Sequence, residues 1–194
     1  MFRKNGSNID GSAVFARLYS GSQAKVTRST FLENSNFQTF STLRYYSVGN
    51  NILTSLDNNT FALNSTSSVL DFSTSGAKVS NNILWFNSLD NSKAGISYLG
   101  SLNQTLRFSY NNFETEVNYG VGNISQDPLF EDINNGDFSL ESGSPSIDTG
   151  HPDLDQDGET WETDEDDQDS DGTRLDMGSA SFNQFENIPP NISL

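Results

Sequence analysis

The chain has 194 residues, with 26 acidic against 10 basic side chains and a formal net charge of −16. Nucleic acids and anionic membranes are therefore poor candidate partners, because both are bound through clustered lysine and arginine. The absence of cysteine excludes disulfide frameworks, zinc–thiolate sites and thiol nucleophiles. No apolar run approaches the roughly 18 residues of a membrane span, so none is expected.

Ser, Asn and Thr together make up about a third of the chain, with 29, 23 and 14 copies. Their side chains compete for backbone hydrogen bonds, so this composition disfavours long helices. Hydrophobic residues account for only 33%, and the chain contains 14 phenylalanines. It is thus too aromatic for full disorder and too polar for a compact sphere, which favours a fold with much surface per residue.

A short phrase recurs in the first 122 residues: an apolar residue, a polar turn ending in Asn or Thr, and a second large apolar residue. The second apolar positions are Phe31, Ile52, Ile83 and Phe113, and a partial copy ends at Phe61. The spacings of the four full copies, 21, 31 and 30 residues, lie in the range that indicates a solenoid. We expect these four side chains to point into one elongated core.

Alternation with a period of two marks residues 24–26, 77–79 and 106–108 as half-buried strands. No stretch has a sustained 3.6-residue stripe. Strands of three to five residues with Asn or Gly at the corners predict an all-β fold, a right-handed parallel β-helix.

Asparagine suits the corners because it tolerates the left-handed backbone region. In stacked coils, equivalent asparagines can hydrogen-bond along the axis, and Asn51, Asn82 and Asn112 are the candidates for such a ladder. The alternative is that Asn-Asn pairs mark hairpin turns of a β-sandwich.

The segments 11–16 and 24–34 resemble one coil of the right-handed β-helices of bacterial surface proteins. Residues 122–132, 136–150 and 171–178 are similar to the ending of pectate-lyase-like β-helix proteins of the choice-of-anchor type. The resemblance covers nearly the whole chain and implies an extracellular, rod-like domain. It implies no single activity, because this fold carries lyases, adhesins and proteins without known chemistry.

The chain divides into four parts on this interpretation. Residues 1–122 form β-helix coils, 123–150 closing strands and a cap in which Leu129 and Phe130 plug the last coil, 151–178 an acidic calcium-loop segment, and 179–194 a tail. The sequence contains no signal peptide and starts like the end of a coil. We therefore expect the C-terminal portion of a longer secreted or cell-surface protein whose leader is not in this sequence.

Twelve acidic residues and one base lie within residues 151–176. The segment 153–164 places acids at loop positions 1, 3, 5 and 12 and Gly at 6, which is the spacing of an EF-hand calcium loop. The ligands expected for Ca²⁺ are Asp153, Asp155, Asp157, Asp164 and the carbonyl of Glu159. Because position 12 is Asp instead of Glu, bidentate closure is less certain and binding is weaker.

A second phrase, Asp167-Gln-Asp169-Ser-Asp171-Gly172, repeats the first half of this motif. Its position 12 is a glycine, so we expect Asp176 as the last ligand, with Asp148 as a further contributor. The alternative is a solvated acidic linker, because dense like charges repel one another and extend the chain.

Four bases are candidate catalytic groups of a lyase. Lys25 and Arg28 lie on one predicted strand, and Lys78 and Arg107 occupy the similar place on later coils. No catalytic phrase surrounds them, and outward polar positions explain them equally well. His151, the only histidine, is expected at the surface. A strip of aromatic residues for sugar stacking is a further option, with the members Tyr45, Tyr46, Trp85, Phe86, Tyr98 and Tyr110.

The sequence thus predicts a secreted or cell-surface β-helix module, non-catalytic, stabilised by Ca²⁺ and associated with an extracellular polysaccharide or another surface. The alternative is a fragment of a polysaccharide lyase or hydrolase acting on acidic glycans. A weaker one is an ice-binding or adhesin rod. The chain is expected to be a monomer or part of a longer chain.

Overall fold

A computed structural model describes residues 1–7, 13–36, 41–48, 52–73, 77–89, 92–93, 95–98, 107–116 and 119–185. This part of the chain is all-β, as predicted, and its sheets are mainly parallel. Its helices are two single 3-10 turns, η1 (Ile133–Asn135) and η2 (Glu165–Asp167). Neither has the length and apolar character that crossing a bilayer requires.

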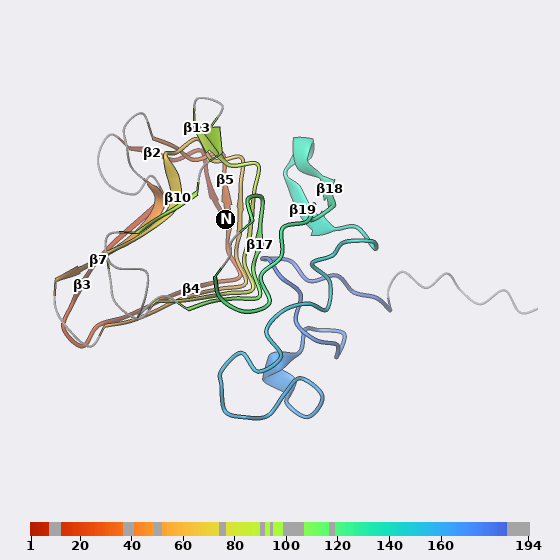
Figure 1. Cartoon of the computed structure of the whole chain (residues 1–194). Coiled ribbons are helices and arrows are strands. Elements are labelled where there is room, and N and C mark those ends of the chain that lie inside the picture. The colour runs from red at the N-terminus through yellow and green to blue at the C-terminus, as the bar shows by residue number, and fades with distance from the viewer. Residues whose placement is uncertain are drawn as a thin grey trace, which may run out of the picture.

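Three parallel sheets surround a common interior and form the sides of a triangle in Figure 1. The first sheet has the order β1 (Phe2–Arg3), β5 (Thr30–Leu32), β9 (Thr60–Ala62), β12 (Ile83–Trp85), β17 (Asn112–Phe113). The second has the order β15 (Gly95–Tyr98), β10 (Ser68–Ser73), β7 (Ser41–Val48), β3 (Val14–Tyr19). The third has the order β16 (Arg107–Ser109), β11 (Ala77–Ser80), β8 (Leu53–Asp57), β4 (Gln23–Thr27).

The chain passes through the three sheets in a fixed order, and we call each passage a round. The rounds are β3–β4–β5, β7–β8–β9, β10–β11–β12 and β15–β16–β17. Equivalent strands pair in register, so that Val26, Leu56, Val79 and Phe108 follow one another across the third sheet. The strands predicted at 24–26 and 77–79 are confirmed, and so is the described part of the third one, in β16.

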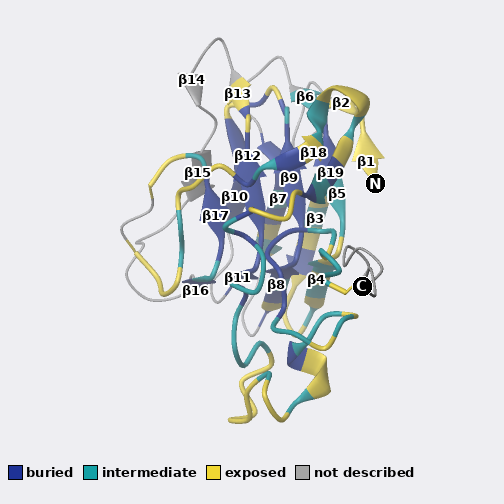
Figure 2. Cartoon of the chain, turned by 90° about the vertical axis from the view of Figure 1, so that its right-hand side faces the viewer, coloured by how far each residue is buried: buried dark blue, intermediate teal, exposed yellow. Residues whose placement is uncertain are grey.

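Three two-stranded sheets complete the described structure. They are β2 (Gly6–Ser7) with β6 (Ser35–Asn36), β13 (Ser88–Leu89) with β14 (Ser92–Lys93), and β18 (Phe130–Asp132) with β19 (Asp137–Leu140). Only the first of these pairs is parallel. β18 and β19 lie outside the triangle, in front of β5, β9 and β12 in Figure 2.

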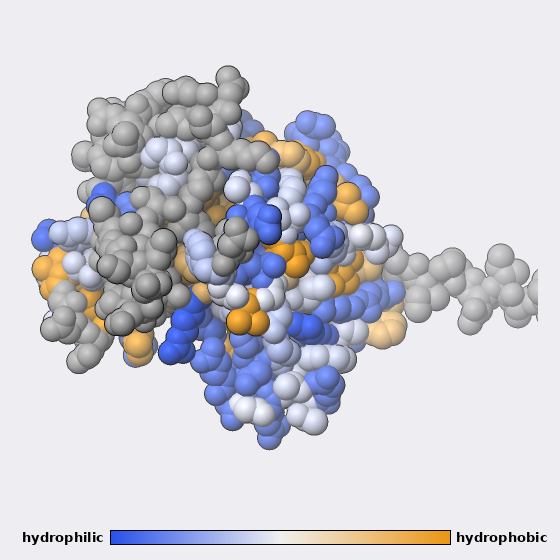
Figure 3. Space-filling model, in the orientation of Figure 1, coloured by the Kyte–Doolittle hydropathy of each residue, from blue (hydrophilic) through white to orange (hydrophobic). Residues whose placement is uncertain are grey.

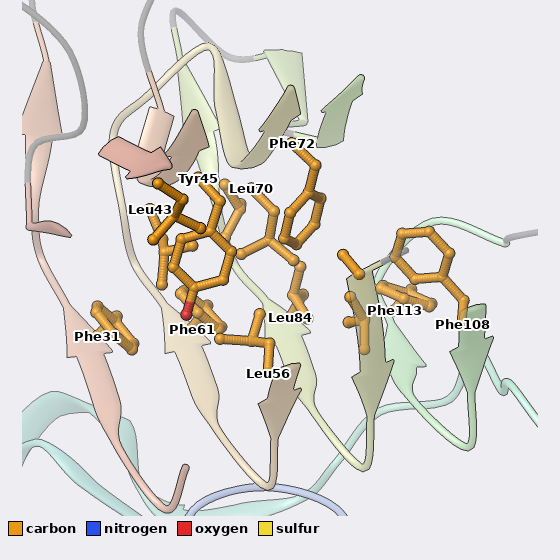
Figure 4. Packing of buried hydrophobic residues seen from close by; sticks show 14 of the residues in the cluster. Phe31, Leu43, Tyr45, Leu56, Phe61, Leu70, Phe72, Leu84, Phe108 and Phe113 are labelled. Carbon is orange, nitrogen blue, oxygen red and sulfur yellow. The ribbon is translucent and has the colours of Figure 1, made fainter. Parts of the chain in front are cut away.

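The interior of the triangle holds one apolar core, in which each round stacks its side chains on those of the round before. The rings of Phe2 and Phe31 lie 4.8 Å apart and those of Phe31 and Phe61 4.4 Å apart, both nearly parallel. Figure 4 shows Leu43 and Tyr45 beside Phe61 in this core. Burial on this scale supplies the main favourable free energy of folding.

The predicted alignment of the repeats is wrong at two positions. Register pairs Phe31 with Phe61, and Phe61 with Leu84, so Leu84 occupies the core position expected for Ile83. Ile83 is fully buried, but on the opposite face of β12. Ile52 belongs to the core, yet it precedes β8 and is not equivalent to Phe31.

Each round turns from the third sheet to the first through a corner of two residues. The first corner residue has a positive φ between 47° and 58°, at Arg28, Asn58, Asn81 and Tyr110. Such a backbone is costly for most residues but tolerated by asparagine. This conformation turns the chain sharply enough to begin the next strand at once.

The second corner residue is Ser29 in the first round and an asparagine in the other three, and these asparagines form a side-chain ladder. Nδ2 of Asn59 donates to Oδ1 of Asn82 at 2.9 Å, and Asn82 donates in the same way to Asn111. A second ladder runs through the other corner of the first sheet, formed by Asn5, Asn34, Asn64 and Asn87.

Of the asparagines predicted to form a ladder, Asn82 is confirmed and Asn112 is wrong by one position. Asn112 instead donates to the Gln126 carbonyl at 2.7 Å and to Ser146 Oγ at 3.0 Å. Asn51 lies outside the described residues. The neighbours Asn59 and Asn111 complete the ladder because the two-residue corner fixes which asparagine points inward.

The C-terminal region, residues 119–185, packs along the outer face of the first sheet (Figures 1 and 2). A second apolar cluster joins the first sheet to the C-terminal region. It contains Leu32, Ala62, Ile83 and Trp85 from the sheet, and Phe130, Phe138, Leu140 and Met177 from the C-terminal region. The prediction that Phe130 plugs the end of the last coil is therefore wrong, because Phe130 packs in this second cluster instead. Ile83 and Trp85 make the outer face of the first sheet apolar, and the C-terminal region covers that face.

Candidate functional site

The first Asp-rich loop, residues 153–159, is shaped by its own carboxylates. Asp155 Oδ1 accepts from the Asp157 N–H at 3.0 Å, and Asp157 Oδ1 accepts from the Glu159 N–H at 2.8 Å. Asp153 Oδ2 accepts from the Gly158 N–H at 3.3 Å, which closes the turn. Gly158 has φ +99°, a conformation that glycine adopts without a steric penalty.

These turns bring together three of the predicted calcium ligands. Oxygen atoms of Asp153, Asp155 and Asp157 all lie within 4.8 Å of one another. Asp164 does not belong to this group, and its side chain instead caps η2 by accepting from the Asp166 N–H. Glu159 is exposed and enters the loop through its backbone.

Asp167 lies at the junction of the two Asp-rich phrases. It is 1% exposed, its Oδ1 accepts from the Leu154 N–H at 2.5 Å, and its Oδ2 has no hydrogen-bond partner in the described structure. Burial raises the pKa of this carboxyl, and the nearby charges of Asp153 and Asp155 raise it further. A buried carboxylate with a free oxygen is costly unless a proton or a cation neutralises it.

A second group of carboxylates contains Asp169 and Asp176, the expected ligands of the second phrase, together with Asp148, the expected further contributor. Oxygen atoms of Asp148, Asp169 and Asp176 lie within 4.8 Å of one another. Asp176 Oδ1 accepts from the Asp148 N–H at 2.7 Å and Oδ2 from the Phe182 N–H at 2.6 Å. One oxygen each of Asp148 and Asp169 is buried without a partner in the described structure.

Burial raises the pKa of Asp169 to about 7 and that of Asp176 to about 6, because the charged form is poorly solvated there. Asp171 lies outside the group. Although burial opposes it, hydrogen bonds from Asp169, Thr173 and Gln184 lower the pKa of Asp171 to about 2. Near neutral pH this second group therefore favours a proton or a cation over three free charges.

The acidic segment is attached to the strands by polar contacts. Lys78 Nζ donates to the Leu154 carbonyl, and Arg107 Nη1 donates to Gln156 Oε1 at 3.4 Å. The His151 N–H donates to Asn81 Oδ1 at 2.7 Å. In Figure 3 this segment forms the hydrophilic lower part of the molecule.

The register confirms that three of the four bases stand in one row: Lys25, Lys78 and Arg107, with Ser55 between the first two. Arg28 lies just beyond β4, at the corner with positive φ. The row is not an open face, because the acidic segment lies against Lys78 and Arg107.

A polar cavity of about 500 Å³ separates this row from the acidic segment. Lys25, Arg28 and Lys78 line one side together with Asp57. A second hollow of about 610 Å³ shares Lys25 and Lys78 and extends the space to Arg107. The two hollows share four lining residues, Lys25, Ser55, Lys78 and Asp155, and we call them together the segment groove.

Asp57 was not foreseen as a site residue. It is 4% exposed, and its Oδ1 has no hydrogen-bond partner in the described structure. Burial raises its pKa, although hydrogen bonding to Ser55 and the charges of Lys78 and Lys25 oppose the shift. The available signal was positional: Asp57 pairs with Thr27 and Ser80, so it is the one acid among equivalent positions in those rounds.

The aromatic residues considered for a sugar-stacking strip do not share one exposed face among the described side chains. Tyr45 is 1% exposed in the core, whereas Tyr46, the next residue of β7, is 37% exposed. Tyr110 contacts His151 edge to face and lies under Arg174. The side chain of Tyr98 lies outside the described residues. His151 is half-buried, and burial followed by the charge of Lys78 lowers its pKa.

No family model, curated protein or solved structure matches this chain. The function therefore has to be argued from the geometry described above.

Proposed function

We propose that the chain is a non-catalytic parallel β-helix module, stabilised by Ca²⁺, that works outside the cell at a polysaccharide-rich surface. The observation that carries the proposal is the convergence of Asp153, Asp155 and Asp157 near Asp167, which keeps a buried oxygen unpaired. Three carboxylates at alternate positions before a glycine are the ligand pattern of calcium loops.

The arrangement of the strands supports the solenoid part of the proposal. Four successive rounds enter the three parallel sheets in the same order, and two asparagine ladders connect them along one direction. A sandwich built from hairpins would instead pair consecutive strands in antiparallel fashion. The resemblance to pectate-lyase-like surface proteins agrees with this interpretation.

The chemistry of the acidic segment favours calcium over magnesium. Ca²⁺ accepts six to eight oxygen ligands in a flexible shell, whereas Mg²⁺ requires a small, regular octahedron. The ligands Asp155 and Asp157 are exposed, and Asp164 does not close the loop as a bidentate glutamate would. Such a site is expected to be weak, in the range of about 10⁻⁴ to 10⁻³ M typical of extracellular modules.

The row of bases is the feature that a lyase would use, and its contacts favour another role. Lys78 binds the Leu154 carbonyl and Arg107 binds Gln156, so both bases hold the acidic segment against the third sheet. We therefore assign the row to the attachment of the calcium loops, and a scaffold role to the module as a whole.

Isothermal calorimetry with CaCl₂ tests the proposal. The unmodified chain should bind Ca²⁺ at millimolar concentration, and Asp155→Asn with Asp157→Asn should lose this heat. Glu131→Gln with Glu141→Gln is the matched control, since it removes two charges at exposed positions outside the loops. Absence of Ca²⁺ binding by the unmodified chain would show that the acidic segment is a solvated linker.

A further inference from the structure

The segment groove is lined by Asp57, a carboxylate with one oxygen that nothing in the described structure satisfies. Asp57 points outward from β8, yet the acidic segment covers it so that only 4% remains exposed. Its Oδ2 lies 3.9 Å from Lys25 Nζ, at the limit of an ion pair, and its Oδ1 has no partner. A buried acceptor of this kind requires a hydrogen-bond donor, either from water or from a ligand.

The groove is large enough for a ligand. The part that contains Asp57 has a volume of about 500 Å³, which lies within the range of about 300–1,000 Å³ for small-molecule sites. The adjoining part of about 610 Å³ follows the row of bases across the sheet. An elongated ligand of two or three units therefore fits better than a single small ion.

The charges that line the Asp57 part nearly cancel. Three bases, Lys25, Arg28 and Lys78, face four carboxylates, of Asp57, Asp155, Asp166 and Asp167, so the net lining charge is −1. If Asp155 and Asp167 are engaged by calcium, the remaining charges sum to +1. In neither state does the lining select a strongly charged ligand, because positively and negatively charged side chains lie close together.

We propose that the segment groove binds a short neutral saccharide, with the Asp57 carboxylate at the groove wall accepting a hydroxyl and Lys25 and Arg28 donating to sugar oxygens. Hydroxyl groups both donate and accept hydrogen bonds, so a sugar can pair with the basic and the acidic side chains of the groove without introducing charge. Leu154 and Leu175 offer apolar contact to its C–H groups. The inference deepens the proposed function, on which it rests, by locating the polysaccharide contact beneath the calcium-held segment.

Saturation-transfer NMR with glucose, galactose, mannose, cellobiose and lactose, in CaCl₂, tests the site. At least one neutral sugar should bind, and Asp57→Leu should weaken it tenfold or more. This substitution keeps the branched skeleton of the side chain and removes an unpaired buried carboxylate, so the fold should persist. Lys25→Met should also weaken binding, and Lys4→Met, another exposed lysine far along the first sheet's edge, should not.

The inference would be wrong if no neutral sugar bound at millimolar concentration, or if galacturonate bound more tightly than galactose. It would also be wrong if the Asp57→Leu and Lys25→Met variants bound sugar as tightly as the unmodified chain. Calorimetry with CaCl₂ on the same samples separates the two proposals. Calcium binding without sugar binding removes the saccharide site alone. Sugar binding that depends on Asp57, without any calcium binding, removes the calcium proposal and leaves the site.

Discussion

The stranded rounds and the C-terminal region satisfy their backbones in opposite ways. In the rounds, nearly every strand pairs with its counterparts in neighbouring rounds, and buried asparagines complete the corners. In the described residues of the C-terminal region only β18 and β19 form a strand pair, and carboxylates accept many of the remaining N–H groups. The first region is stabilised by repetition, and the second depends on charge and on the surface that it covers.

Substitutions on the two faces of β12 should separate these regions. Leu84→Asp places a carboxylate in the common core and should unfold the whole chain, since burying an unpaired charge costs several kcal/mol. Ile83→Asp, one residue earlier, should release the C-terminal region and leave the rounds folded. Circular dichroism with limited proteolysis measures both. If Ile83→Asp abolished the strand signal as fully as Leu84→Asp, the division into two regions would be wrong.

Removing one rung of a ladder should cost less than a charge in the core. Asn82→Ala removes the acceptor of the Asn59 backbone N–H and the side-chain donor to the Leu56 carbonyl. Unsatisfied buried groups of this kind destabilise a protein by about 3 kcal/mol in total. Urea denaturation should show the loss, and Asn134→Ala, at an exposed position, should show almost none.

Calcium should act on the C-terminal region alone. Its stabilising free energy should grow as RT ln(1 + [Ca²⁺]/Kd), reaching about 2.7 kcal/mol at a hundredfold excess over Kd. Hydrogen exchange should show slower exchange around Asp157 and Glu159 with CaCl₂, and MgCl₂ should do less. EDTA should open residues 151–178 to proteases. Equal protection in the stranded rounds would contradict an effect confined to this region.

A pH dependence is expected of the calcium-free protein, and it too should be confined to the C-terminal region. Burial raises the pKa of Asp169 to about 7 and that of Asp176 to about 6, from 3.8 in the free side chain. Since the folded state binds these protons more tightly, the stabilising contribution is complete below pH 3.8 and is lost as the pH rises through 6 and 7. Exchange protection of the Asp148 and Phe182 amides, corrected for intrinsic rates, should fall between about pH 5 and about pH 8. A rise over this range would refute the assignment.

Local patterns in the sequence predicted the features that depend on neighbouring residues. Alternation at 24–26 and 77–79 identified strands of the third sheet, and with them the row containing Lys25 and Lys78. The spacing of Asp153, Asp155 and Asp157 likewise predicted the group that the structure brings together. The second phrase likewise predicted that Asp169, Asp176 and Asp148 come together, and the structure groups these three.

Features that depend on register were not predictable in the same way. The phrase around Ile83 fits the core equally well when shifted by one residue, and such a shift moves a side chain to the opposite face of the sheet. The positive φ of Asn81 decides the matter by fixing where β12 begins. Asp57 depends on which segments meet in space, so no local spacing revealed it.

The corners of the rounds also bear on how this protein tolerates change in length. Between the third and first sheets the linker is always two residues, at 28–29, 58–59, 81–82 and 110–111. The described strands of the second and third sheets are separated by three residues between β3 and β4 and by eight between β15 and β16. Insertions and deletions should therefore be accepted at the second-to-third corner and rejected at the asparagine corners. A longer loop can therefore be added at this one corner of the triangle, by evolution or by design, without disturbing the stacking of the rounds.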